Sequence, residues 1–167
     1  MVVRSAGLLL FRRAASGDAE VLLVHPGGPY WSHRDAGAWS IPKGEVEEGE
    51  EPSAVAEREF AEELGRPAPG GSRIDLGEIT QAGGKRVRAW AVEGDFDASD
   101  LTSNRFEMEW PPRSGRRQSF PEVDRAGWFP LAVAAEQLFA AQVELLGRLP
   151  APGEAGGTPP PPGPPVR

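Results

Sequence analysis

The sequence predicts an α/β domain in which a mixed, partly antiparallel sheet lies between helices on its two faces. Three observations support this fold class. Strand-like apolar runs stand on both sides of a helix-forming segment, so the chain has to cross over between strands. A second helix-forming segment follows the last strand-like run. The 167 residues, 39% of them hydrophobic, suit one domain with a substantial core.

The expected strands are short and are bounded by turn residues. Two early runs are rich in Leu and Val, which predicts buried strands, and Gly83 and Gly84 separate two later runs as in a strand pair. Residues 94–103 are polar and predict a loop, and residues 111–121 predict a basic, irregular loop. The expected strands are residues 5–11, 20–25, 75–81, 86–92, 104–110 and 126–129, with a brief extended piece at 38–41.

The first helix is expected to begin near Pro52 and to run to residue 64. Ala, Glu and Leu dominate this segment and are good helix formers. Proline at the first helical position loses no needed hydrogen bond, and Gly65 is a natural stop after the last turn. At about 100° per residue, one stripe of side chains forms the packing face. That stripe consists of Ala56, Phe60 and Leu64.

The second helix is expected over residues 131–149, where Leu, Ala and Phe recur. From residue 150 onward the chain is rich in Pro and Gly and ends in a proline run. Such composition predicts a disordered or polyproline segment. The expected organisation is therefore one domain over residues 1–149 and a tail over 150–167.

Composition excludes several kinds of chemistry. The chain has no cysteine, which excludes disulfides, thiolate catalysis and Cys-ligated zinc. With only two histidines a multi-histidine metal site is not expected, so any metal would take oxygen ligands, as Mg²⁺ or Mn²⁺ does. A net charge of −7 disfavours binding to RNA or DNA along an extended surface. Residues 8–11 are too short an apolar run for a signal peptide, no stretch is long enough for a membrane span, and a cytoplasmic location is expected.

Glu59, Glu62 and Glu63 fall on one face of the predicted first helix. A glutamate-rich helix is ordinarily just a solvated surface. Here, however, like charges on one face destabilise the helix by roughly a few tenths of a kcal/mol per pair. They also lie near the helix C-terminus, where the helix dipole disfavours negative charge, and Arg58 alone does not compensate them. A divalent cation would offset these costs, and such ions suit polyphosphate chemistry.

The spacing of residues 44–66 resembles the signature of the Nudix hydrolase family. That signature is a glycine, five residues, a glutamate, seven residues, and then Arg-Glu-apolar-any-Glu-Glu-any-Gly-apolar. Here Gly44 and Glu50 are followed by Arg58-Glu59-Phe60-Ala61-Glu62-Glu63-Leu64-Gly65. Only Arg66 departs, at a packing position after the helix. The layout of residues 1–149 also resembles the family, which implies an α/β/α sandwich of the Nudix type.

The resemblance implies a metal site for Mg²⁺ or Mn²⁺ on the first helix. Its implied ligands are Glu59, Glu63 and Glu62 together with the backbone carbonyl of Gly44. By the same resemblance, the catalytic Arg58 and the supporting Glu50 orient the loop and the ligands from behind, as partners of metal ligands generally do.

The general base is left open, because members of the family draw it from different places. Glu62 is one candidate, as a further ligand or as the base that activates water. Glu122 stands where similar members place a functional glutamate, and it is a candidate ligand or base, or else a surface residue at a turn. Asp124 is an alternative for either part.

Candidates for substrate binding lie in the loops. Lys43 and Arg34 are candidates for phosphate contact, and so is Arg117, since arginine suits bidentate phosphate binding. Tyr30 is a candidate for stacking on a base. Each of them is also compatible with an ordinary surface role. Five aromatic residues are instead expected in the core, namely Trp39, Trp90, Trp110, Trp128 and Phe129.

The implied function is a metal-dependent pyrophosphohydrolase. Water would attack a phosphorus of a nucleoside triphosphate or dinucleoside polyphosphate and cleave the phosphoanhydride. The alternatives are hydrolysis of ADP-ribose or a nucleotide sugar, removal of pyrophosphate from RNA 5′ ends, and a non-catalytic Nudix module that senses a nucleotide. The acidic balance weighs against RNA. The expected partner is a small nucleotide, and the sequence leaves the oligomeric state open.

Overall fold

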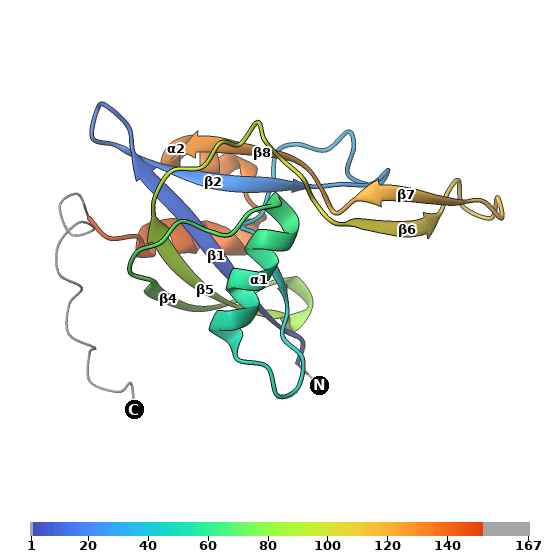
Figure 1. The fold of residues 1–167 in the computed structure, drawn as a ribbon, viewed down its shortest axis with the longest axis horizontal. Coiled ribbons are helices and arrows are strands. Elements are labelled where there is room, and N and C mark those ends of the chain that lie inside the picture. The colour runs from blue at the N-terminus through green and yellow to red at the C-terminus, as the bar shows by residue number, and fades with distance from the viewer. Residues whose placement is uncertain (1, 152–167) are drawn as a thin grey trace.

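A mixed sheet forms the centre of the molecule, and helices cover both of its faces (Figure 1). The computed structural model describes residues 2–151. The strands of the sheet are β1 (Arg4–Arg13), β2 (Ala19–Pro26), β3 (Lys43–Glu45), β4 (Ile74–Thr80), β5 (Arg86–Glu93) and β8 (Val123–Pro130). Their order is β4-β5-β1-β2-β8, and β3 also pairs with β1.

The strand pairing confirms the predicted fold class. Within the described residues β1 and β5 run parallel, and every other neighbouring pair in this sheet is antiparallel. Parallel strands need a crossover connection, and helix α1 (Pro52–Leu64) lies in the chain that joins β1 to β5. The helical segments α2 (Leu131–Gln137) and η2 (Ala140–Arg148) follow β8. The result is an α/β/α sandwich with a mixed, partly antiparallel sheet.

The alternation of side chains along β1 explains how one strand supports two cores. Leu8 and Leu10 point to the face covered by α1, where Phe60 is fully buried. Leu9 and Phe11 point to the opposite face, which α2 and η2 cover. Burying a side chain such as Phe or Leu contributes about 1.5–3 kcal/mol relative to leaving it exposed. Both faces of the strand are therefore apolar, as the sequence predicts.

Helix α1 has the boundaries that its sequence predicts. Pro52 occupies the start of the helix, and Gly65 ends it with φ at 85°, a left-handed conformation that glycine adopts without strain. The predicted packing stripe is buried, and one further residue belongs to it. The buried side chains are Val55, Ala56, Phe60 and Leu64.

The prediction of one continuous helix over residues 131–149 is wrong. The helix ends at Gln137, and the chain is extended at Leu138 and Phe139 before η2 begins. The break lets this segment form two backbone hydrogen bonds with Trp39. The Trp39 N–H donates to the Gln137 carbonyl at 2.9 Å, and the Trp39 carbonyl accepts from the Phe139 N–H at 2.8 Å. Beyond the break, the buried Gln142 side chain accepts from the Ile41 N–H at 3.0 Å. Contacts with distant residues thus override a helical pattern.

The prediction of an irregular loop over residues 111–121 is confirmed for residues 111–116 and wrong for residues 117–121. Strand β7 (Arg117–Pro121) pairs antiparallel with β6 (Arg105–Glu109), and the two form a separate ribbon. Figure 1 shows this β6–β7 ribbon projecting from the rest of the domain. The sequence of β7 has no β-branched residue and includes Arg and Pro, so it carries no strand signal of its own.

Strand β8 and the tryptophans also differ from the prediction. Strand β8 is longer than residues 126–129 because β2 pairs with it along its length. Of the tryptophans expected in the core, Trp39 is buried, whereas Trp90, Trp110 and Trp128 are only half-buried. Among the described residues no helix has the length and apolar character needed to cross a membrane. Most of the expected tail lies outside the described residues, which stop at residue 151.

Candidate active site

The C-terminal half of α1 carries three carboxylates beside its packing stripe. Because Phe60 and Leu64 are buried against the sheet, Glu59, Glu62 and Glu63 are directed to the flank of the helix. The short strand β3 packs against the same helix. Lys43 and Gly44, the first two residues of β3, therefore lie next to these carboxylates.

Glu63 is the most enclosed of the three carboxylates. Its Oε2 atom is buried and has no hydrogen-bond partner among the described residues. Burial raises the pKa of Glu63 to about 8, with further contributions from the negative charges of Glu59 and Glu122, while the positive charge of Lys43 opposes the rise. A buried acceptor without a donor costs free energy, which a proton or a bound cation at this oxygen would offset.

Glu59 lies against the backbone of Gly44. A Cβ atom built on Gly44 would come within 2.0 Å of the Glu59 carboxyl carbon. Partial burial raises the pKa of Glu59, and the negative charges of Glu62 and Glu122 add to the rise. The close contact explains why the position before Glu45 carries glycine.

Replacing Gly44 with Ala is expected to lower kcat by about tenfold or more, because the added methyl group occupies the place of the Glu59 carboxylate and small displacements of catalytic groups are costly. The melting temperature should change little, since a flexible carboxylate can move aside. Steady-state kinetics and thermal unfolding measure both. Gly147→Ala is the matched control, because nothing lies within 4 Å of its added Cβ. A kcat equal to that of the control would contradict the prediction.

Lys43 on β3 is a second cation beside the carboxylates, in addition to Arg58 on α1. Burial lowers its pKa, the neighbouring Lys85 lowers it further, and the charges of Glu63 and Glu59 raise it. A half-buried ammonium group that faces two carboxylates can also contact a phosphate oxygen bound beside them.

Arg58 ties the loop before α1 to the carboxylate face. Its guanidinium donates to Glu50 at 2.5 Å and lies 3.8 Å from Glu59 and 3.9 Å from Glu62. The hydrogen bond from Arg58 lowers the pKa of Glu50. Glu50 in turn accepts from the Glu47 N–H at 2.9 Å. Arg58 and Glu50 thus join the loop to the helix from one side.

Glu122 reaches the carboxylate face from the base of the β6–β7 ribbon. Its charge acts on both Glu59 and Glu63, so it lies near them although it is distant in sequence. Asn104 fixes this arrangement: its N–H donates to the Glu62 carbonyl at 3.0 Å, and its carbonyl accepts from the Glu122 N–H at 2.8 Å. The sequence gives no signal for Asn104, since one polar residue at the end of a loop forms no pattern.

Asp124 has a different partner. Its carboxylate lies 2.7 Å from Nδ1 of the fully buried His25, and Nε2 of His25 lies 2.6 Å from the Arg34 carbonyl oxygen. This hydrogen-bond chain links β2, β8 and the loop after β2. Asp124 therefore supports the neighbouring strands.

The remaining candidates lie away from the carboxylates. Tyr30 is exposed and packs edge-on against Trp110 on the ribbon. The guanidinium of Arg34 lies over the Trp31 ring at 5.5 Å. Arg117 stands at the far end of β7 and pairs with Glu107 at 3.7 Å. The structure thus brings α1, β3 and Glu122 together at the carboxylates. Tyr30, Arg34 and Arg117 lie outside this carboxylate group.

The residues present fit a divalent cation in one respect, the buried and unpartnered Oε2 of Glu63. Glu59, Glu63, Glu62 and the Gly44 carbonyl would hold it, and when bound it would polarise phosphoryl oxygens and activate water. Within residues 2–151 no three Asp, Glu or His side chains form a ready ligand set.

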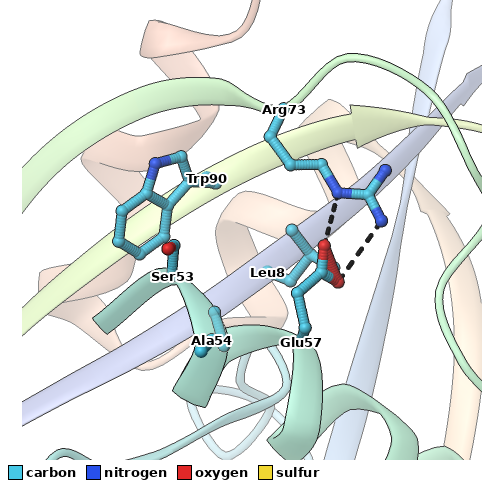
Figure 2. Close-up of a pocket in the computed structure, with 7 residues that line it drawn as sticks. Leu8, Ser53, Ala54, Glu57, Arg73 and Trp90 are labelled. Atoms are coloured by element: carbon cyan, nitrogen blue, oxygen red, sulfur yellow. Dashed lines mark hydrogen bonds and ion pairs between the residues drawn. The ribbon is translucent and has the colours of Figure 1, made fainter. Parts of the chain in front are cut away.

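A cavity of about 340 Å³ lies beside the other half of α1 (Figure 2). Figure 2 shows Glu57 turned toward Arg73, whose Nε donates to it at 2.5 Å, so this carboxylate is already paired. The cavity therefore lacks the free carboxylates of the candidate site. The lining residues are Leu8, Ser53, Ala54, Ala56, Glu57, Arg73 and Trp90.

The chain is similar in sequence and in fold to several known proteins. The chain is 32% identical over 150 residues to an 8-oxo-(d)GTP phosphatase of Mycolicibacterium smegmatis, covering 81% of this chain but only 37% of that protein. It is 30% identical over 145 residues to an RNA pyrophosphohydrolase of Caulobacter vibrioides, covering 72% of this chain and 84% of the relative. The crystal structure of a C. elegans Ap4A hydrolase binary complex superposes with a TM-score of 0.61 at 23% identity, covering 88% of this chain and 94% of that one.

The family model described as a NUDIX domain matches residues 1–149. This range includes the whole sheet, the helical segments α1, α2 and η2, and the carboxylate group. The chain therefore belongs to the Nudix hydrolase family, whose enzymes act on phosphoanhydrides.

Proposed function

We propose that the chain is a Mg²⁺- or Mn²⁺-dependent pyrophosphohydrolase that cleaves the phosphoanhydride of a nucleoside triphosphate or a dinucleoside polyphosphate. The observation that carries the proposal is the enclosed Glu63 carboxylate, which faces Glu59, Glu122 and Lys43 and has one oxygen without a partner. Such a group binds a hard cation and, through it, a polyphosphate.

The residues of the site have three different roles in the proposed reaction. Glu59, Glu63, Glu62 and the Gly44 carbonyl hold the cation, and Arg58 and Glu50 position the helix and its loop. Lys43 binds a phosphate oxygen. In the reaction a water oxygen bonds to phosphorus while the bridging P–O bond breaks, and the leaving phosphate keeps the bridging oxygen.

Glu62 or Glu122 accepts the proton of the attacking water. Both are more accessible than Glu63, with the Glu62 side chain 39% exposed and Glu122 exposed. Their positions differ, since Glu62 stands on α1 and Glu122 lies between β7 and β8. Because Glu62 is also a proposed ligand, Glu62→Gln and Glu122→Gln are compared at saturating metal. Loss of a ligand alone is then offset by the metal, whereas loss of the base still lowers kcat and removes the acidic limb of its pH profile.

Several candidate substrates follow from the relatives and from the chemistry. The Mycolicibacterium relative supports an oxidised nucleoside triphosphate, and the Caulobacter relative supports a 5′-triphosphorylated RNA. The residues of the carboxylate group suit any of them, since each presents a phosphoanhydride.

The test is a substrate panel with product identification in Mg²⁺ and in Mn²⁺. It includes nucleoside triphosphates, oxidised triphosphates, dinucleoside polyphosphates, ADP-ribose and 5′-triphosphorylated RNA. We expect turnover of at least one triphosphate or dinucleoside polyphosphate and complete loss on adding EDTA. If the protein binds nucleotides but hydrolyses none of these compounds, the proposed enzymatic function is wrong and a nucleotide-sensing function takes its place.

A further inference from the structure

Tyr30 and Trp110 form an aromatic pair on the projecting ribbon, outside the carboxylate group. We infer that this pair binds a nucleobase at the far end of an extended polyphosphate substrate, beyond the reach of a single nucleoside triphosphate. The inference rests on the proposed function, because the carboxylate group fixes the position of the attacked phosphate.

The loop after β2 follows the ribbon from its base outward. The Gly27 N–H donates to the Glu122 carbonyl at 2.9 Å, and a Cβ on Gly27 would lie 1.9 Å from the Pro121 carbonyl oxygen. Tyr30 then meets Trp110, with ring centroids 5.2 Å apart and planes at 78°. The ribbon and the loop thus form one continuous surface that starts at Glu122.

The aromatic pair stands far from the attacked phosphate. Asn104 bonds to both α1 and Glu122, so it marks the end of the ribbon that adjoins the carboxylates. Strand β6 continues from there to Trp110, and a strand advances about 3.3 Å per residue, which gives a separation of roughly 20 Å. One ribose with three phosphates is shorter than this span. A second nucleoside beyond the polyphosphate, or a following nucleotide of an RNA 5′ end, reaches it.

The surface of the pair suits a nucleobase. The Tyr30 side chain is 59% exposed, one of four exposed large hydrophobic residues within the described part of the chain. Its ring lies at 78° to that of Trp110, so the two rings do not cover each other face to face, and bases stack on exposed aromatic faces.

The cations of the ribbon also favour a nucleotide over an apolar partner. Arg113 and Arg116 lie in the turn between β6 and β7, and Arg117 opens β7 with 67% of its side chain exposed. This is a local excess of positive charge on a chain with a net charge of −7. Arginines beside an aromatic surface suit a ligand that has both phosphate and base.

The test compares kcat and KM of Trp110→Ala and Tyr30→Ala with those of the wild type on three substrates: a dinucleoside tetraphosphate, a 5′-triphosphorylated oligoribonucleotide and a nucleoside triphosphate. In the two Ala variants we expect KM to rise by about ten- to a hundredfold for the dinucleoside tetraphosphate, for the oligoribonucleotide, or for both. This rise in KM should be at least about tenfold larger than the rise for the nucleoside triphosphate. Whichever substrate shows the rise identifies the source of the base. Trp110→Phe and Tyr30→Phe should restore KM, which a lost fold would not allow.

Val133→Ala is the control, since Val133 is also an exposed apolar residue but lies on α2. Equal changes in KM for all three substrates, or none, would overturn the inference. If the wild type cleaves no substrate, the proposed function fails, and equilibrium binding of the dinucleoside tetraphosphate decides the inference separately. Affinity unchanged in Trp110→Ala and Tyr30→Ala would then overturn it.

Discussion

Replacing Glu63 with Gln is expected to lower kcat by at least about a hundredfold while leaving the fold intact. The buried Oε2 atom of Glu63 has no donor within residues 2–151. A neutral amide keeps the shape of the side chain but binds a hard divalent cation far more weakly than a carboxylate does. A bound cation contributes several kcal/mol of transition-state stabilisation, and each 1.4 kcal/mol corresponds to about a factor of ten in rate.

The measurement is steady-state turnover of the best substrate at several Mg²⁺ and Mn²⁺ concentrations. Glu51→Gln is the matched control, because it makes the same chemical change just before α1, where the side chain forms no capping hydrogen bond. Circular dichroism checks that both variants are folded. An unchanged kcat in Glu63→Gln would contradict the assignment of Glu63 as a metal ligand.

The same substitution is expected to stabilise the metal-free protein at high pH. The pKa of Glu63 is about 8 in the folded protein against a usual value of 4.5, so the folded state keeps a proton that the unfolded state releases. Below pH 4.5 Glu63 is protonated in both the folded and the unfolded state, so its burial does not lower the free energy of unfolding. As the pH rises from 4.5 to 8, folding free energy is lost at about 1.4 kcal/mol per pH unit, and above pH 8 the full cost of a few kcal/mol remains.

Thermal or urea unfolding in EDTA between pH 5 and pH 9 measures this effect. Glutamine does not titrate, so the stability of Glu63→Gln relative to the wild type should be near zero at pH 5 and reach a few kcal/mol at pH 9. Saturating Mg²⁺ or Mn²⁺ should stabilise the wild type more than the variant, since a ligand that binds the folded state shifts the equilibrium toward it. A difference that stays constant across this pH range would contradict the buried, proton-holding carboxylate.

Much of the fold can be predicted from local pattern alone. The apolar runs of β1 and β2 indicate strands buried on both faces, and Pro52 and Gly65 mark the ends of α1. These features depend on intrinsic preference and periodicity, which neighbouring residues along the chain determine.

The two wrong predictions arose where distant contacts decide the conformation. Residues 138–139 leave the helical path because Trp39 offers backbone hydrogen bonds there. Strand β7 exists because β6 supplies its partner groups, although its own sequence favours no strand. The local sequence pattern of these two segments does not indicate which distant residues they pair with.

For the candidate site the division is similar. The sequence by itself determined the carboxylate helix, since the spacing of Glu59, Glu62 and Glu63 beside a packing stripe follows from helix geometry. Only the tertiary structure decided that Glu122 and Lys43 stand beside them, that Asp124 belongs to His25, and that Arg117 lies at the far end of a ribbon. The physical reason is that a local pattern fixes which side chains share a face, whereas packing between distant segments decides which faces meet.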